Sequence, residues 1–297
     1  MSTSPAARLR RLITGDDLIV APGIYDGLTA ALVERHRFPA AYVSGGAASS
    51  AVLGRPDLGL MTASEMIAHT SRLRSATSLP LVVDIDTGYG NELNVRHTIE
   101  SYIRVGAAAV HLEDQVFPKR CGHLAGKAVI PTEDAVSKVR AAVAARADAD
   151  LVVIARTDAR APLGLREAID RANRFADAGA DMIFLEAPQS AAEMETIAAQ
   201  VDAPLVANVL ANSKTPVLST AELAQLGFRL ALYPAITAGA AVTAVDTALA
   251  TLGEQGRPPE QDAFGPADLF KIVGLDDWLE WSEHYTGTSA AKPHTLQ

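Results

Sequence analysis

Three carboxylates stand at spacings that suit a metal ion. Asp84 and Asp86 are two residues apart at the end of an apolar run, and Glu113 ends the next run. Residues i and i+2 of a strand point to the same side, so both aspartates face one volume, toward which Glu113 projects from the neighbouring strand. Oxygen ligands of this kind favour Mg²⁺, which keeps several of its bound waters in such sites, and Mn²⁺ could substitute for it. The sequence therefore predicts a divalent-metal site here, and His111 is interpreted as a buried barrel histidine.

A second group of reactive residues lies in one loop, which contains Lys119, Arg120, Cys121, Gly122 and His123. Two cations and a histidine beside the thiol favour its thiolate form and attract anionic ligands. An isolated cysteine is usually buried and inert, but these charged surroundings favour a role for Cys121 as an acid or a nucleophile. The loop also suits a segment that closes over a substrate and excludes water.

The elements that must carry these residues alternate along the chain. Eight runs rich in Val, Ile and Leu show little polar alternation, as in parallel strands covered on both faces. They are residues 18–21, 40–43, 79–83, 107–111, 151–155, 182–185, 204–207 and 229–232. Amphipathic stretches between them, such as residues 64–75, 132–146 and 165–178, predict helices. Eight such units fit an α/β fold of the (β/α)8 TIM-barrel type better than the alternative, an open doubly wound sheet.

Polar residues follow most of these predicted strands. They are Ser44, Gly45 and Gly46; Asp84 and Asp86; Glu113 and Asp114; Arg156 and Asp158; Glu186; and Asn208. In a barrel the carboxyl ends of all strands meet at one rim, where active sites are built. Polar residues also begin ordinary loops, but six strands ending in this way favour a functional site.

Composition limits the class of protein. The chain has 297 residues, 48% of them hydrophobic, which suits one barrel domain over residues 1–297, although two domains remain possible on length. We expect a leading helix in residues 1–16 and a helical extension with a tail in residues 265–297. The net charge of −9 argues against a nucleic-acid partner. A single cysteine predicts a cytoplasmic protein, and no run of signal-peptide or membrane-spanning type is expected.

These residues also carry a family resemblance. Glu113-Asp114-Gln115 followed by Lys119-Arg120-Cys121-Gly122-His123 resembles the signature of the isocitrate lyase and phosphoenolpyruvate mutase superfamily, in its lyase branch. Further similar motifs are residues 42–46, 54–59, 84–90, 154–158, 185–187, Asn208 and residues 232–234. The resemblance implies a TIM barrel whose C-terminal helices are exchanged between subunits of a homotetramer, a dimer of dimers.

The resemblance also implies roles for individual residues. Asp84, Asp86 and Glu113 would hold Mg²⁺, partly through water, with Asp57 nearby. A small carboxylate substrate would be bound by Ser44, Gly45, Gly46, Gly122 and Arg156, with Glu186 and Asn208 lining the remaining wall. A guanidinium can grip a carboxylate with two parallel bonds, and glycine N–H groups can approach an oxyanion closely.

The activity implied is Mg²⁺-dependent carbon–carbon cleavage. A small 2-hydroxy di- or tricarboxylic acid would yield an α-keto acid, such as pyruvate or glyoxylate, and a second carboxylate. Tyr42 or a metal-associated group could accept the first proton, and Cys121 would protonate the departing carbanion, whose charge Lys119, Arg120 and His123 would stabilise. The alternatives are a phosphonomutase, an oxaloacetate hydrolase or decarboxylase on the same scaffold, and a non-catalytic binding protein.

Two positions depart from the pattern of the lyases. Ala211 and Gly239 stand where a glutamate and an arginine are expected, and a lost arginine removes a charge-assisted contact to a carboxylate. The sequence therefore predicts a substrate with fewer carboxylates than 2-methylisocitrate, or with a bulkier and more apolar end.

Overall fold

The computed structural model describes residues 4–122, 124–259 and 265–286, and these residues form a closed parallel β-barrel. Its strands follow one another in chain order around the barrel: β1 (Ile19–Ile24), β2 (Ala41–Val43), β3 (Leu81–Asp84), β4 (Ala109–Glu113), β5 (Val152–Thr157), β6 (Met182–Leu185), β7 (Leu205–Asn208) and β8 (Phe228–Tyr233). Pairing of β8 with β1, in which Leu230 lies opposite Ile19, closes the ring. The predicted strands and the (β/α)8 fold are confirmed.

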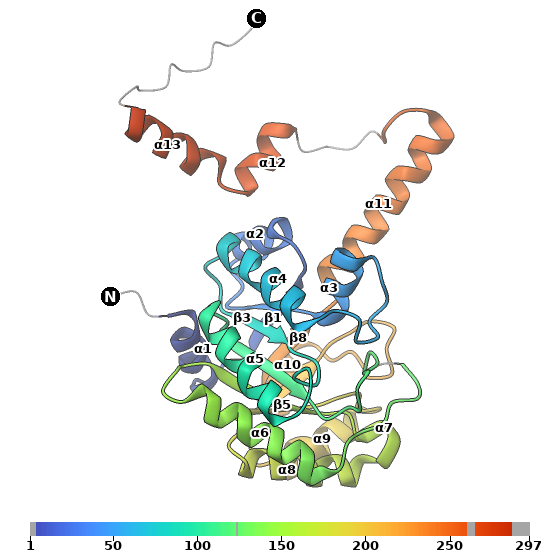
Figure 1. Cartoon of the computed structure of the whole chain (residues 1–297). Helices are drawn as coiled ribbons and strands as arrows, with labels where there is room; N and C mark the ends of the chain where they lie inside the picture. Colours follow the sequence, from blue (N-terminus) through green and yellow to red (C-terminus); the bar gives the residue numbers. More distant parts are fainter. Residues whose placement is uncertain (1–3, 123, 260–264, 287–297) are drawn as a thin grey trace, which may run out of the picture. The chain divides into compact units, whose positions relative to one another are not determined.

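Helices surround the strands, as Figure 1 shows for α4, α5, α6 and α8. The helices are α1 (Pro5–Thr14), α2 (Gly27–Arg35), α3 (Gly45–Ala48), the π-helix η1 (Ser49–Leu53), α4 (Ala63–Ala76), α5 (Glu92–Arg104), α6 (Thr132–Arg146), α7 (Arg160–Leu163), α8 (Leu165–Asp177), α9 (Ala191–Gln200), α10 (Thr220–Gln225), α11 (Ile236–Gln255), α12 (Pro266–Ile272) and α13 (Leu275–Thr286). Capping residues in the local sequence mark where several of these helices begin. At α4, for example, Thr62 and Glu65 form a reciprocal capping box that satisfies two backbone N–H groups.

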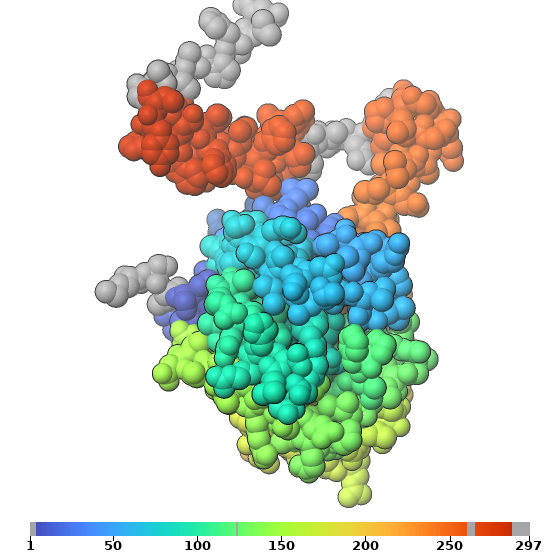
Figure 2. All heavy atoms as spheres, viewed as in Figure 1, coloured from blue at the N-terminus to red at the C-terminus, as the bar shows by residue number. Residues whose placement is uncertain are grey.

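The hydrophobic core is layered around the sheet. Side chains such as Ile154, Phe184 and Leu230 fill the barrel interior, and Leu9 of α1 packs onto this cluster. Two further clusters lie between the strands and the outer helices. In Figure 2 the surface follows chain order from α4 and α5 to α6, as expected where each helix returns beside its own strand. The interior is therefore packed solid, and space for a ligand is left only at its rim.

The chain divides into two compact units, Met1–Ala244 and Val245–Gln297. The first contains the whole barrel and the predicted leading helix, α1. The second contains the end of α11 together with α12 and α13, so the predicted C-terminal extension is helical, and residues 287–297 lie outside the described part of the chain. A single domain over all 297 residues stays a prediction.

The helix α11 corrects one expectation. By length and composition it could cross a membrane, with a mean hydropathy of 1.3 and no residue buried. The prediction that no run of this kind occurs was wrong, because α11 is a 20-residue helix made mostly of small and apolar residues with few charges. Twenty residues of helix extend over about 30 Å, the thickness of a bilayer core, but length and hydropathy alone also suit a helix that packs against protein.

Candidate active site

The aspartates that follow β3 meet a buried lysine. Nζ of Lys119 lies 2.8 Å from Oδ1 of Asp86 and 2.5 Å from Oδ1 of Asp57. Burial raises the pKa of Asp84, but the neighbouring His111, Lys119 and Arg156 outweigh burial and lower that pKa overall. Burial and the charge of Asp84 raise the pKa of Asp86 to about 7. The carboxylates Asp57, Asp84 and Asp86 therefore carry more negative charge together than the single ammonium of Lys119 can neutralise.

Backbone geometry holds the two aspartates in place. The N–H of Asp86 donates to Oδ1 of Asp84 at 3.0 Å, and the N–H of Gly45 donates to Oδ2 at 3.2 Å. A Cβ at Gly45 would lie 2.7 Å from that same oxygen, so no larger residue fits. The Gly45 N–H, which we expected to bind the substrate, is thus directed at Asp84. Ser44 caps α3 by accepting from the N–H of Ala47.

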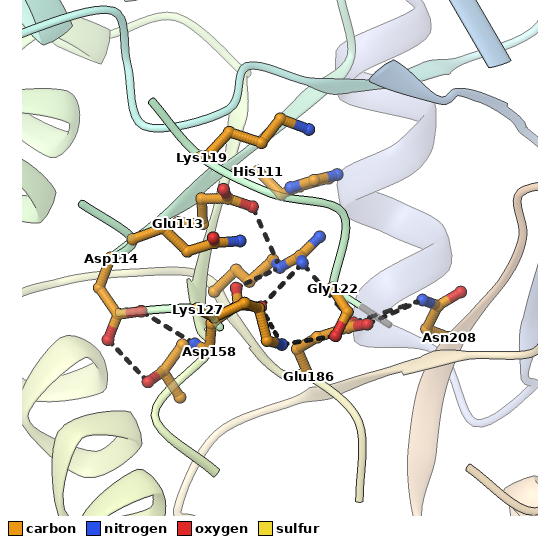
Figure 3. A network of polar contacts seen from close by, with 12 residues as sticks. His111, Glu113, Asp114, Lys119, Gly122, Lys127, Asp158, Glu186 and Asn208 are labelled. Carbon is orange, nitrogen blue, oxygen red and sulfur yellow. Dashed lines mark hydrogen bonds and ion pairs between the residues drawn. The ribbon is translucent and has the colours of Figure 1, made fainter. Parts of the chain in front are cut away.

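A guanidinium is held at the end of β5. Nε and Nη2 of Arg156 donate to the two oxygens of Asp158 at 2.8 and 3.1 Å, and Nε lies 3.3 Å from Oε2 of Glu113. The guanidinium also stacks over Phe184, with Cζ 5.0 Å from the ring centre. Burial raises the pKa of Asp158, but Arg156 and Lys127 outweigh it and hold that pKa at about 2. Figure 3 shows this network around Asp158 and Glu186.

A tyrosine and a histidine lie deeper in the barrel. The Tyr42 hydroxyl is 2.8 Å from Nε2 of His111, which in turn lies 3.7 Å from Oδ1 of Asp84. Burial lowers the pKa of His111 to about 4. Burial, and then the charge of Asp84, raise the pKa of Tyr42 well above its usual value. Both groups are therefore neutral near pH 7, and His111 is buried as predicted yet touches the site.

The loop after β4 is docked onto the barrel rim. The Gln115 side chain bonds the backbone N–H and C=O of Arg120 at 3.0 and 2.8 Å, and the N–H of Cys121 donates to the Asp57 carbonyl at 3.2 Å. These bonds leave Cys121 half-buried. The Arg120 side chain is exposed and donates to the Ala125 carbonyl, so it points along the loop rather than into the site. His123 lies outside the described residues.

These residues surround a cavity of about 570 Å³ at the carboxyl ends of the strands. Its polar or charged lining residues, together with two glycines, are Tyr42, Ser44, Gly46, Ser50, Asp57, Asp84, Lys119, Cys121, Gly122, Arg156, Glu186, Asn208 and Thr243. Its other lining residues are Ala47, Leu210, Pro234, Ala235, Ala238, Gly239 and Val242. Most of the predicted site residues thus meet at one cavity, whereas Gly45, Asp86, Glu113 and Arg120 do not line it.

The donor atoms can be tested against a metal ion. Among the described residues, no three His, Cys, Asp or Glu side chains converge to hold an ion directly. Oε1 of Glu113 is nevertheless buried without a hydrogen-bond partner, and Oδ1 of Asp86 meets only the Lys119 ammonium. Burial, and then the nearby Asp158, raise the pKa of Glu113 well above its usual range, although Arg156 opposes them. These oxygens fit a hard cation held partly through water, rather than one chelated by all three carboxylates.

Three residues of the network were missed as site residues. Lys127 and Asp114 both contact Asp158, which closes β5 two positions after Arg156. Asp114 and Asp158 had been recognised only as polar residues at strand ends, and the spacing of two places the side chains of Arg156 and Asp158 on one side of the strand. Nothing in the local sequence marks Lys127, because its partner is 31 residues away.

A solid barrel with a charged cavity at the carboxyl ends of its strands defines a (β/α)8-barrel enzyme. Residues 9–252 match the family model described as phosphoenolpyruvate phosphomutase. The chain is 41% identical to a 2-methylisocitrate lyase of Aeropyrum pernix over 92% of this chain and 89% of that protein. The chain belongs to the phosphoenolpyruvate mutase and isocitrate lyase superfamily, whose members use a divalent metal.

Solved structures agree with this assignment. A 2,3-dimethylmalate lyase, described as a member of the superfamily, superposes with a TM-score of 0.93 at 38% identity and covers 100% of both chains. An oxaloacetate acetylhydrolase bound to 3,3-difluorooxalacetate gives a TM-score of 0.93 at 36% identity, over 97% of this chain and 99% of that one.

Proposed function

We propose that this protein is a Mg²⁺-dependent carbon–carbon lyase. Its substrate is a small 2-hydroxy di- or tricarboxylic acid, which it cleaves to an α-keto acid, such as pyruvate or glyoxylate, and a second carboxylate. One observation carries the proposal: the Cys121 loop is docked on the rim of a cavity that also exposes Asp84 and Arg156. The names of the two lyase relatives support the same chemistry.

Binding rests on two cations. Arg156 lines the cavity and is held in orientation by the two oxygens of Asp158, so it can meet a substrate carboxylate with little loss of side-chain freedom. Lys119 adds a second positive charge on the same wall. A bound Mg²⁺, held by Asp84, Asp86 and Glu113 partly through water, would supply Lewis-acid stabilisation of the oxygen that becomes the carbonyl.

Cleavage requires that the substrate hydroxyl loses a proton while the bond between the two carbons breaks. Tyr42 is a neutral hydroxyl on the cavity wall and is a poor base alone, because burial disfavours its phenolate. It can accept a proton while passing its own to Nε2 of His111, which lies 2.8 Å away. The pair therefore acts as a proton relay, in which the neutral imidazole of His111 is the final acceptor and becomes an imidazolium.

The departing carbon takes the electron pair of the broken bond, and a neighbouring carboxylate delocalises it. The Cys121 thiol lines the cavity and donates the proton that completes the second product. Lys119 also lines the cavity and stabilises the negative charge until the proton arrives. Arg120 points away from the cavity, so we assign it no direct part.

The apolar wall limits the substrate. Leu210, Ala238, Gly239 and Val242 line the cavity, and no Lys or Arg beyond Lys119 and Arg156 lines it among the described residues. A third carboxylate placed here would lose its hydration without gaining a cation. We propose a diacid that carries alkyl groups at this end in preference to a tricarboxylate.

The other activities would use the same cavity. A phosphonomutase, an oxaloacetate hydrolase or decarboxylase, and a non-catalytic binding protein differ in what happens after the substrate is bound, and no observation favours any of them over the lyase.

We also propose a cytoplasmic homotetramer, a dimer of dimers that exchanges C-terminal helices. Several large apolar side chains are exposed in the single chain, including Phe270 (52%), Trp278 (66%), Trp281 (52%) and Tyr285 (83%). Contiguous exposed apolar area of this kind marks interaction sites. Sedimentation equilibrium should give the mass of four chains; the mass of one chain would refute the proposal.

The activity is tested with a panel of 2-hydroxy diacids. We expect release of pyruvate or glyoxylate with Mg²⁺, and none with EDTA. Cys121→Ser should lower turnover by about a hundredfold or more while leaving Mg²⁺ and pyruvate binding intact, since the serine hydroxyl is a far weaker acid than the thiol. Unchanged turnover in Cys121→Ser, or no keto acid from any member of the panel, would contradict the proposal.

A further inference from the structure

A buried ammonium lies beside the active site without a part in the reaction above. The Lys127 side chain is 1% exposed, and Nζ donates to two oxygens: Oδ1 of Asp158 at 2.7 Å and the carbonyl of Gly122 at 2.5 Å. Figure 3 shows Lys127 reaching Asp158 and the Gly122 segment. A buried ammonium is costly unless it is paired and hydrogen-bonded, so both acceptors fix its position.

One of these acceptors belongs to the rigid barrel. Asp158 also accepts both bonds of the Arg156 fork, and its N–H donates to Oδ1 of Asp114 at 2.8 Å. Asp114 is itself held by Thr157 at 2.7 Å and by Arg171 at 3.1 Å. Asp158 is therefore a fixed point shared by the substrate-binding guanidinium and by Lys127.

The other acceptor, the Gly122 carbonyl, belongs to the loop that carries Cys121. Gly122 directly follows Cys121 and packs so closely on the site that a Cβ there would lie 2.2 Å from Oε1 of Glu186 and 2.6 Å from Nη2 of Arg156. Because Gly122 is the residue next to Cys121, a restraint on the Gly122 carbonyl also restrains the backbone beside the thiol. Lys127 holds that carbonyl.

We propose that Lys127 is a positioning residue that couples the Cys121 loop to Arg156 through Asp158. The proton donor, Cys121, and the substrate-binding guanidinium of Arg156 are then held at a fixed position relative to each other, although they lie on different segments of the chain. This inference rests on the proposed function for its kinetic consequence, but its structural part, the docking of the loop by Lys127, does not depend on which reaction is catalysed.

The docking is tested first without substrate. Cys121 is the only cysteine in the chain, so the rate of its alkylation by iodoacetamide, followed by mass spectrometry, reports on the loop alone. Lys127→Met should raise that rate by about tenfold at fixed pH, because the Gly122 carbonyl loses its donor. Lys127→Arg should remain near the wild-type rate, since a guanidinium can still reach both acceptors.

A matched control separates this effect from the loss of any half-buried lysine. Lys138 also donates to a backbone carbonyl, that of Thr87 at 3.0 Å, and Lys138→Met should leave the alkylation rate at the wild-type value. If Lys127→Met does not fold, Lys127→Gln carries the same test, because its shorter, uncharged amide cannot hold both the Gly122 carbonyl and Asp158. A folded Lys127→Met or Lys127→Gln that alkylates at the wild-type rate overturns the proposal.

The effect of Lys127 on catalysis is measured with any 2-hydroxy diacid of the panel that the wild-type protein cleaves. Lys127→Met should lower kcat by about a hundredfold with little change in KM, because a misplaced proton donor slows the chemical step while Arg156 still binds the carboxylate. Lys127→Arg should restore most of kcat. A rise in KM with unchanged kcat would contradict the proposal, whereas absence of turnover in the wild type would refute the proposed function and leave the alkylation result standing.

Discussion

Lys119 and Asp86 form a buried ion pair, with Nζ 2.8 Å from Oδ1, at the end of β3. The ammonium thus lies within the group of carboxylates that is expected to hold Mg²⁺. Two cations that share one set of carboxylates repel each other, and this pair therefore affects both metal binding and ionisation at the site.

Lys119→Met should strengthen Mg²⁺ binding. For a unit charge and a divalent cation about 4 Å apart, the repulsion would be about 8 kcal/mol at an effective dielectric constant of about 20, and solvent and side-chain relaxation offset most of it, so we expect about tenfold tighter binding. Isothermal titration calorimetry measures the affinity directly. Lys119→Arg keeps the charge and should bind Mg²⁺ like the wild type; weaker binding in Lys119→Met would show that Lys119 supports the metal instead.

The ionisation of Asp86 should make stability depend on pH. Its pKa is raised to about 7, first by burial and then by Asp84, above an unfolded value of about 4. The contribution of Asp86 to the free energy of unfolding is therefore present in full below about pH 4 and is lost as the pH rises through about 7.

Urea unfolding in EDTA at about pH 5 and about pH 8 measures this dependence. The wild type should lose stability relative to Asp86→Asn across that interval, while its affinity for Mg²⁺ rises because the metal requires the ionised carboxylate. Parallel stability profiles of the two proteins would mean that the pKa of Asp86 is not raised.

Gly239→Arg should change the substrate preference. A Cβ at Gly239 meets no heavy atom within 4 Å, so the cavity wall can accept a side chain there. An added guanidinium supplies the cation that a third carboxylate needs, and we expect about tenfold higher kcat/KM for a tricarboxylic 2-hydroxy acid relative to an alkyl-substituted diacid. Gly239→Met is the uncharged control. An equal shift in both variants would attribute the effect to size.

Gly122→Ala should disrupt the loop without unfolding the barrel. The added methyl group would lie 2.2 Å from Oε1 of Glu186 and 2.6 Å from Nη2 of Arg156, so either the loop or these two side chains must shift. We expect a loss of activity of about a hundredfold, with a change in Tm of only a few degrees, since the loop lies outside the hydrophobic core. Gly253→Ala, where a Cβ meets nothing within 4 Å, is the matched control. Full activity in Gly122→Ala would show that the loop tolerates this displacement.

The sequence alone determined the barrel and the position of its functional rim. Strand periodicity, apolar runs and capping residues such as Thr62 and Glu65 are local properties, so they could be recognised along the chain without knowledge of the fold. The same holds for Asp84 and Asp86, whose spacing of two places both on one side of a strand.

Only the tertiary structure decided which neighbours those side chains have. Arg120 and Lys127 are both cations of one loop, yet Arg120 bonds the loop itself, whereas Lys127 is buried against Asp158. Glu113 closes its strand as expected, but the bond from Arg156 draws it away from the cavity. The physical reason is that these contacts join residues far apart in sequence, and their direction depends on burial and on charges that other strands supply.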